Sequence, residues 1–174
     1  MTPLYLFAQG LGIVGLVVIV LSFQCKKNRN FFLAQGAGSL LFFGNFILIG
    51  AYGGAFFNLT NLLRGLLLSK NPTKKWKLIL IEAAYTGCFV FSVIMSPTLP
   101  QILLVLAPFS ALVVMTVLMV RAKPVPIRTF QIAWMSPSWI IHNIFNFSLG
   151  GLICETLNMV SSAIFLWRLQ KEKK

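Results

Sequence analysis

The sequence predicts an all-helical membrane protein that crosses the bilayer seven times. Of its 174 residues, 57% are hydrophobic and only 10% are charged, whereas charged residues make up about 25% of an ordinary soluble domain. Seven spans of about 20 residues use about 140 residues and leave no room for a soluble domain. The Lys and Arg residues fall in every second connection between apolar runs. With an even number of spans, the basic connections and the basic C-terminal tail would not all lie on one side of the membrane.

Seven apolar runs, separated by polar or glycine-rich connections, define the expected spans. We place the spans at residues 4–24, 31–51, 54–69, 77–95, 99–120, 129–148 and 150–168. The first run has no basic segment before it, and its basic cluster follows it. This order is the reverse of a signal peptide, so we expect the first run to stay as a span.

The cations predict how the spans are oriented. The chain has 15 Lys and Arg against three acidic residues, and only Arg64 among the cations falls in the interior of an expected span, away from its ends. Because cytoplasmic loops carry the Lys/Arg excess, we expect the N-terminus outside and the basic tail, residues 169–174, in the cytoplasm. A nucleic-acid-binding protein would need a basic face on a folded domain. The cations lie between apolar runs instead, so we expect no nucleic-acid partner.

The two ends of the chain resemble each other at an offset of 97 residues. The matched positions are Gly53-Gly54 and Gly150-Gly151, Asn45 and His142, Asn58 and Glu155, and Asn61 and Asn158. We therefore expect a first three-helix bundle at 1–69, a linker loop and fourth helix at 70–97, and a second bundle at 98–168. The fourth helix turns the chain once more, so both halves face the same way. Parallel halves of this kind enclose a central cavity.

Motifs in the last third resemble those of a known family. W-I-I-H-N at 139–143, S-L-G-G at 148–151, Glu155 and W-R-L-Q at 167–170 occur in one register. Together they resemble the YgjV family of small bacterial inner-membrane proteins, and Q-G at 9–10 and L-I-G-A-Y at 48–52 extend the resemblance to the first half. The resemblance implies a multi-pass protein of the bacterial inner membrane and says little about activity.

The layout of three, one and three helices also resembles the SWEET sugar transporters and their PQ-loop relatives. Those proteins place an Asn on the third helix of each half beside the central cavity, and Asn61 and Asn158 occupy matching places here. The sequence departs from that group in its paired prolines. Pro108 and Pro137 stand in the second half, but Leu11 and Leu40 take the equivalent places in the first.

Polar side chains inside the expected spans are the candidates for a substrate site. A charge at the centre of the bilayer costs about 2.5 to 3.5 kcal/mol, so an intramembrane acid such as Glu155 suggests function. His142 is the only histidine and lies at a similar depth, where the two residues could relay a proton. The expected substrate-binding residues are Asn45, Asn58, Asn61, Trp139, His142, Asn143, Glu155 and Asn158.

Structural roles stay open for the same residues. Glu155 could tie two helices together, His142 could bond to a backbone carbonyl, and the Asn side chains could bond between helices for about 0.6 kcal/mol each. Trp139 could simply pack in the bundle. Arg64 and Glu82 lie at matching depths beside the third connection, so we expect a structural ion pair, with an inner gate as the second interpretation.

The sequence thus favours a small inner-membrane transporter or permease that moves a small polar solute between two pseudo-symmetric halves. The alternative is a membrane protein that binds or escorts a ligand without transport. An enzyme is disfavoured, because the sequence has no paired carboxylates, nucleophile motif or metal cluster. Cys25, Cys88 and Cys154 are scattered, which gives no disulfide framework or zinc site. We expect no cofactor and no metal; the lipid bilayer and a solute are the expected partners, and a homo-oligomer is left open.

Overall fold

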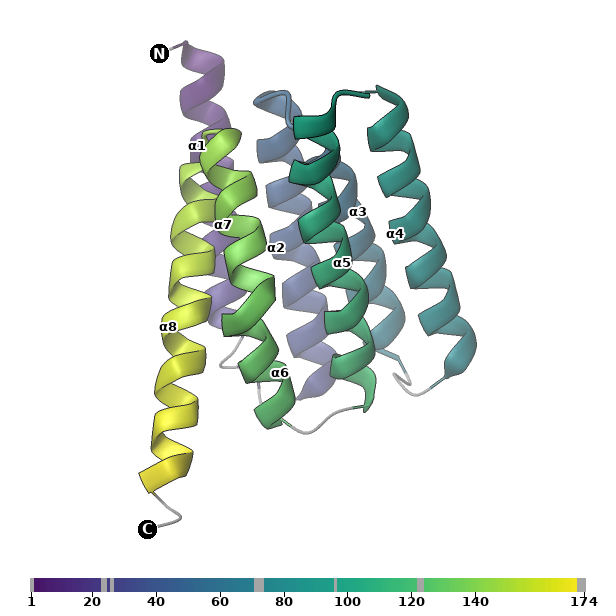
Figure 1. The fold of residues 1–174 in the computed structure, drawn as a ribbon. Helices are drawn as coiled ribbons and strands as arrows, with labels where there is room; N and C mark the ends of the chain where they lie inside the picture. Colours follow the sequence, from purple (N-terminus) through teal and green to yellow (C-terminus); the bar gives the residue numbers. More distant parts are fainter. Residues whose placement is uncertain are drawn as a thin grey trace.

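The computed structural model describes residues 2–22, 25, 27–70, 74–95, 97–121 and 124–171, which fold entirely into helices and their short connections (Figure 1). The helices are α1 (Pro3–Ser22), α2 (Asn28–Leu48), α3 (Tyr52–Leu68), α4 (Lys75–Met95), α5 (Leu99–Arg121), α6 (Pro124–Phe130), the π-helical turn η1 (Gln131–Met135), α7 (Ser136–Phe145) and α8 (Leu149–Lys171). Because α6, η1 and α7 follow one another without a break, they form one interrupted helix. The predicted all-helical class is confirmed.

Five of the described helices are long and apolar enough to cross a membrane: α1, α2, α4, α5 and α8. The other two expected spans are less regular. Helix α3 has 17 residues, or about 25 Å at 1.5 Å per residue, slightly less than the roughly 30 Å of hydrocarbon. The sixth expected span is interrupted by η1. A multi-pass membrane protein follows from the five clear spans, and the sevenfold crossing stays a prediction.

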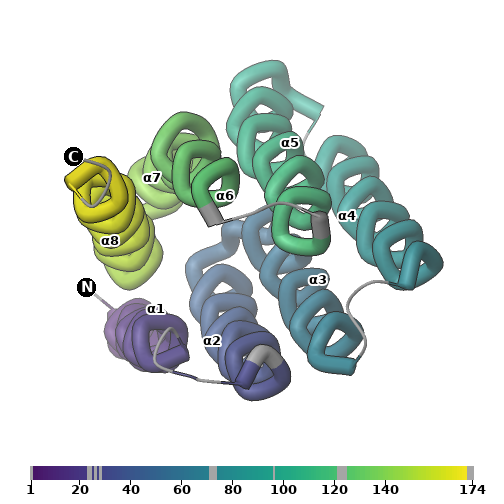
Figure 2. Tube along the Cα trace, turned by 90° about the horizontal axis from the view of Figure 1, so that it is seen from below, coloured from purple at the N-terminus to yellow at the C-terminus, as the bar shows by residue number. Residues whose placement is uncertain are grey.

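The helices form two facing rows when the bundle is viewed along its axis (Figure 2). One row contains α1, α2 and α3, and the other contains α8, the α6–α7 helix and α5. Helix α1 packs against α8 at one side, and α4 packs against both α3 and α5 at the other. The two rows therefore face each other across the middle of the bundle.

The basic connections lie together at one end of the bundle, as the alternation of charges predicted. Helices α1, α3, α5 and α8 end, and helices α2, α4 and α6 begin, at the lower end in Figure 1. Described cations at this end include Lys27, Arg29, Lys70, Lys74, Lys75, Arg168 and Lys171. We call it the basic end, and the other the opposite end. Lys26, Lys123, Lys173 and Lys174 lie outside the described residues.

The sixth helix begins at Pro124, five residues before the predicted start at 129. Prolines at 124 and 126 fit the first helical turn, where backbone N–H groups have no partner within the helix. Pro137 lies farther inside, directly after η1, where the Ser136 N–H bonds to the Gln131 carbonyl five residues back. A proline removes one helical N–H and crowds the preceding turn, and the wider π turn accommodates it.

Close helix contacts depend on glycine. A Cβ on Gly150 of α8 would lie 2.5 Å from the Gly12 backbone of α1, and a Cβ on Gly65 of α3 would lie 2.6 Å from the Phe32 carbonyl oxygen of α2. Small residues of this kind let membrane helices approach closely. The outer surface is apolar, with side chains such as Ile79 and Ile94 about two-thirds exposed. That surface faces the lipid bilayer.

Candidate functional site

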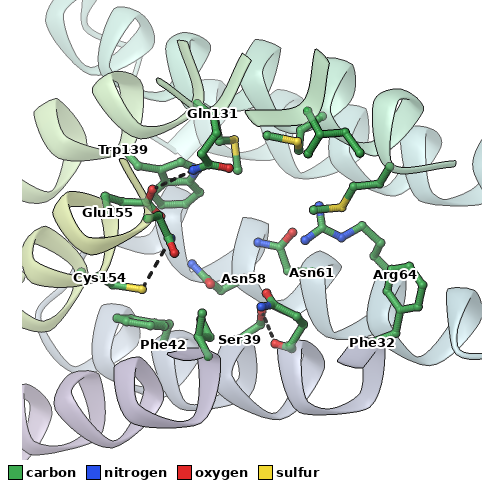
Figure 3. Close-up of a pocket in the computed structure, with 18 of the residues that line it drawn as sticks. Phe32, Ser39, Phe42, Asn58, Asn61, Arg64, Gln131, Trp139, Cys154 and Glu155 are labelled. Atoms are coloured by element: carbon green, nitrogen blue, oxygen red, sulfur yellow. Dashed lines mark hydrogen bonds between the residues drawn. The ribbon is translucent and has the colours of Figure 1, made fainter. Parts of the chain in front are cut away.

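A cavity of about 390 Å³ lies between the two rows of helices (Figure 3). Its volume is within the range of about 300 to 1,000 Å³ that is typical of small-molecule sites. The cavity runs from Asn143 and Gly151 toward Phe31 and Val120 at the basic end. Its polar lining consists of Gln35, Ser39, Asn58, Asn61, Arg64, Arg128, Gln131, Asn143, Glu155 and Asn158. Polar groups from both rows thus meet in an otherwise apolar bundle.

Glu155 of α8 is held by Gln131 of the π turn and by Ser136, the first residue of α7, in the neighbouring helix. Its Oε2 accepts hydrogen bonds from Ser136 Oγ at 2.9 Å and from Gln131 Nε2 at 3.4 Å. Gln131 Nε2 also donates to Ser136 Oγ at 2.8 Å. Because η1 precedes Pro137, the same irregularity that accommodates the proline directs both donors at Glu155. The carboxyl group is therefore positioned at the cavity wall by two side chains.

Two asparagines on α3 line the cavity one turn apart. Asn61 Oδ1 accepts a 2.5 Å hydrogen bond from the Tyr85 hydroxyl of α4, which leaves the amide N–H groups of Asn61 for the cavity. Asn58 Nδ2 donates to the Gly54 carbonyl of its own helix at 2.9 Å, which leaves the Asn58 amide oxygen as an acceptor. The two residues therefore offer opposite hydrogen-bonding groups.

Arg64 points into the cavity one turn beyond Asn61 (Figure 3) and is only 7% exposed. Its Nη1 donates to Thr116 Oγ1 of α5 at 3.5 Å. No hydrogen bond joins it to Glu82, since both Glu82 carboxylate oxygens are buried without a hydrogen-bond partner among the described residues. Glu82 lies on α4 outside the cavity lining, yet the two charges are close enough to attract each other. The expected structural ion pair stays a prediction.

His142 is buried beside the cavity and does not line it. Its ring packs edge-on against Phe46 and Trp139, with centroids 5.4 and 5.2 Å apart, and a Cβ on Gly54 would lie 2.5 Å from His142 Cε1. Nδ1 of His142 has no partner within the described part of the chain. The expected pairing of His142 with Glu155 is therefore not formed.

Asn45 is fully buried at the opposite end and joins three segments. Its Nδ2 donates to the Ala8 carbonyl at 2.8 Å, and its Oδ1 accepts from Ser148 Oγ at 2.8 Å. Nearby, Gln9 donates to the Phe147 carbonyl at 2.9 Å and accepts from the Leu149 N–H at 3.0 Å. We call Gln9, Asn45 and Ser148 the closed-end cluster. Asn45 acts in helix packing here, outside the cavity where it was expected.

The remaining expected site residues line the cavity. Trp139, 5% exposed, forms part of its wall and packs against Phe46 at a centroid distance of 6.0 Å. Asn143 is 2% exposed, and its Oδ1 has no hydrogen-bond partner in the described ranges. Asn158 lies one turn beyond Glu155, with its Nδ2 3.8 Å from Cys154 Sγ.

The sequence matches a family model, Imp-YgjV, described as a bacterial inner membrane protein, over residues 6–173. The chain belongs to the Imp-YgjV family. Membership confirms the resemblance seen in the sequence and places the protein in the bacterial inner membrane. No curated protein and no solved structure matches the chain.

Two of the motifs that carried the YgjV resemblance lie around one end of the cavity. W-I-I-H-N provides Trp139 and Asn143 to the lining and His142 to the packing behind it. S-L-G-G forms the turn into α8, where Gly151 lies against the Asn143 side chain so closely that a Cβ would be 2.6 Å from Oδ1. These residues build the cavity wall jointly.

Sequence reasoning on this YgjV-family chain missed Gln131, Ser136 and the cavity-facing direction of Arg64. Gln131 was a polar residue inside an expected span, six residues before a proline, and that combination was the available signal. Hydropathy gives depth along a helix but not which neighbour a side chain meets. The contact of Gln131 and Ser136 with Glu155 depends on the π turn, which no sequence feature used above predicted.

Proposed function

We propose that this YgjV-family protein is a small transporter or permease that moves a small polar solute through the cavity between its two rows of helices. The observation that carries the proposal is the cavity itself: about 390 Å³ lined by polar side chains from both rows. Polar and charged groups within membrane helices are costly and usually line a solute or ion path. Structural contacts alone would not require a cavity of this size.

The arrangement of the helices supports two equivalent halves. Helices α5, α6 and α8 begin at residues 99, 124 and 149, and α1, α2 and α3 begin at 3, 28 and 52. The start-to-start offsets are 96, 96 and 97 residues, close to the offset of the sequence repeat. A half-turn about the bundle axis exchanges the two rows in Figure 2 and places α1 on α5 and α3 on α8. Parallel repeats around such an axis are an established transporter architecture.

The repeated polar residues support the same pseudo-symmetry. Asn58 and Asn61 line the cavity from α3, and their counterparts Glu155 and Asn158 line it from α8. Asn45 and His142, the other matched pair, are both buried outside the lining. Each half therefore presents the same two positions to the cavity and uses the third for packing.

The described conformation favours access from one side. The lining reaches Phe31 and Val120 at the basic end, whereas the closed-end cluster joins α1, α2 and the start of α8 at the opposite end. With cytoplasmic loops basic, this conformation faces inward. Transport then requires a second conformation, in which the closed-end hydrogen bonds open and the basic end closes. A binding or escort protein would need only the inward-facing conformation.

Flux into proteoliposomes tests the proposal. Purified protein is first screened by thermal shift against small metabolites, and every stabilising compound is then offered to vesicles that contain the protein. We expect uptake by the parent protein, loss of uptake in Ser39→Trp, which fills the cavity, and normal uptake in the control Leu80→Trp, whose side chain is 44% exposed on the outer surface. Binding without uptake would favour the escort alternative.

A further inference from the structure

Hydrogen-bond donors and acceptors are separated along the cavity. On the side of the basic end, Arg64 and the Asn61 amide nitrogen are donors. On the side of the opposite end, Glu155 and the Asn58 amide oxygen are acceptors. Figure 3 places Arg64 and Glu155 on opposite sides of the cavity, with Asn58 and Asn61 between them. The cavity therefore has a donor side toward the basic end and an acceptor side toward the opposite end.

The donor side has hydrogen-bond donors without partners. The Arg64 guanidinium has five N–H donors in a planar fork, and its hydrogen bonding within the described chain is one long contact, to the Thr116 hydroxyl at 3.5 Å. Buried donors without partners are costly. Glu82 attracts Arg64 electrostatically but accepts no hydrogen bond from it. A carboxylate matches the fork with two parallel hydrogen bonds, which is the arrangement that arginine favours.

The acceptor side has acceptor sites that no donor fills. Glu155 receives donors from Ser136 and Gln131 on Oε2 and a side-chain hydrogen bond from Asn158, whereas a carboxylate has about four acceptor sites. Buried acceptors without partners are costly. A ligand with hydroxyl or amino hydrogens on this side would satisfy them.

We propose that the cavity binds a small organic anion, an amino- or hydroxycarboxylate, whose carboxylate contacts Arg64 and Asn61 and whose hydroxyl or amino hydrogens contact Glu155. This inference deepens the proposed function by naming the class of solute, and it rests on the same cavity. Neutral sugars lack the anion that Arg64 requires. Simple fatty acids lack the donors that the other side requires.

Binding by the purified full-length protein in detergent tests the inference. The probes are the common L-amino acids, lactate and glycerate, each compared with its own carboxamide. The carboxamide keeps the hydroxyl and amino groups and loses the negative charge. We expect at least one acid to bind about 10- to 100-fold more tightly than its amide, as for loss of a charged hydrogen-bond pair. Equal affinity for acid and amide, or failure of every acid to bind, would overturn the inference.

Variants test whether Arg64 is responsible for the preference for an acid over its amide. Arg64→Gln should bind acid and amide alike, and Arg64→Lys should retain part of the preference. Arg168→Gln, an exposed cation on α8 outside the lining, serves as the matched control and should behave like the parent protein. Unchanged preference in Arg64→Gln would contradict the proposed contact. If Arg64→Gln does not fold, the comparison of acids and amides on the parent protein still tests the proposed class of ligand.

Flux separates this inference from the proposed function. Arg64-dependent binding of an acid without uptake into proteoliposomes would support the ligand class and contradict transport. Uptake of neutral solutes with no preference for acids would support transport and overturn the ligand class.

Discussion

Replacing Gly150 with alanine should destabilise the bundle, because the added methyl group meets the backbone of another helix. A Cβ at this position would lie 2.5 Å from the Gly12 carbonyl carbon and 2.8 Å from its oxygen, whereas ordinary contact begins at 3.4 Å. Helices α1 and α8 would have to separate by roughly 0.9 Å at this point. Overpacking of this kind costs about 1 to 3 kcal/mol.

Gly87→Ala provides the matched control. Gly87 lies within α4, and a Cβ there has nothing within 4 Å. The same chemical change should therefore stabilise the protein by up to about 1 kcal/mol, since alanine loses less entropy in a helix than glycine does. The two substitutions should have effects of opposite sign.

Equilibrium unfolding in mixed detergent micelles, followed by circular dichroism, measures both variants against the parent protein. We expect a lower unfolding free energy for Gly150→Ala and an equal or higher one for Gly87→Ala. Equal stability of Gly150→Ala and the parent would refute the close packing of α1 against α8, which joins the two rows at one side in Figure 2.

The other predictions concern topology and two buried polar residues. A reporter that works only in the periplasm should be active on the N-terminus, and a cytoplasmic one on the C-terminus; both ends on one side would contradict seven spans. Glu82→Leu should raise the unfolding free energy by about 1 to 3 kcal/mol, because it removes buried oxygens that lack partners. A loss of about 3 kcal/mol or more would instead indicate a charge pair with Arg64. Asn45→Ala should lower stability by about 1 to 3 kcal/mol, since it removes the buried hydrogen bonds of Asn45 to the Ala8 carbonyl and Ser148. Ligand affinity should stay unchanged, and weaker binding would place Asn45 at the site after all.

Long apolar runs made most of the fold predictable. The spans expected at 4–24, 31–51 and 99–120 match α1, α2 and α5 within three residues at each end. The sixth span failed at its start because Pro124 and Pro126 were taken as a connection. A proline in the interior of a helix interrupts it, but a proline in the first turn is tolerated.

The candidate site was only partly predictable, because hydropathy gives the depth of a residue and not its direction. Neighbouring residues in a helix point about 100° apart. Asn143 thus faces the cavity while His142, one residue earlier, packs against Phe46 and Trp139. The same limit applies to Arg64, whose position in the cavity lining the depth alone did not predict. Hydrophobic periodicity does not predict the π turn that brings Ser136 to Glu155.

The central claim, that one cavity is reached in turn from both sides of the membrane, is tested most directly by thiol labelling. Asn158→Cys, in a background with Cys25, Cys88 and Cys154 replaced by serine, places a single thiol in the cavity lining. The protein is reconstituted in vesicles, and a membrane-impermeant maleimide is added to one side at a time. Labelling from the side of the basic end and also from the opposite side is the predicted result. Labelling from one side only, with and without a bound solute, would contradict transport.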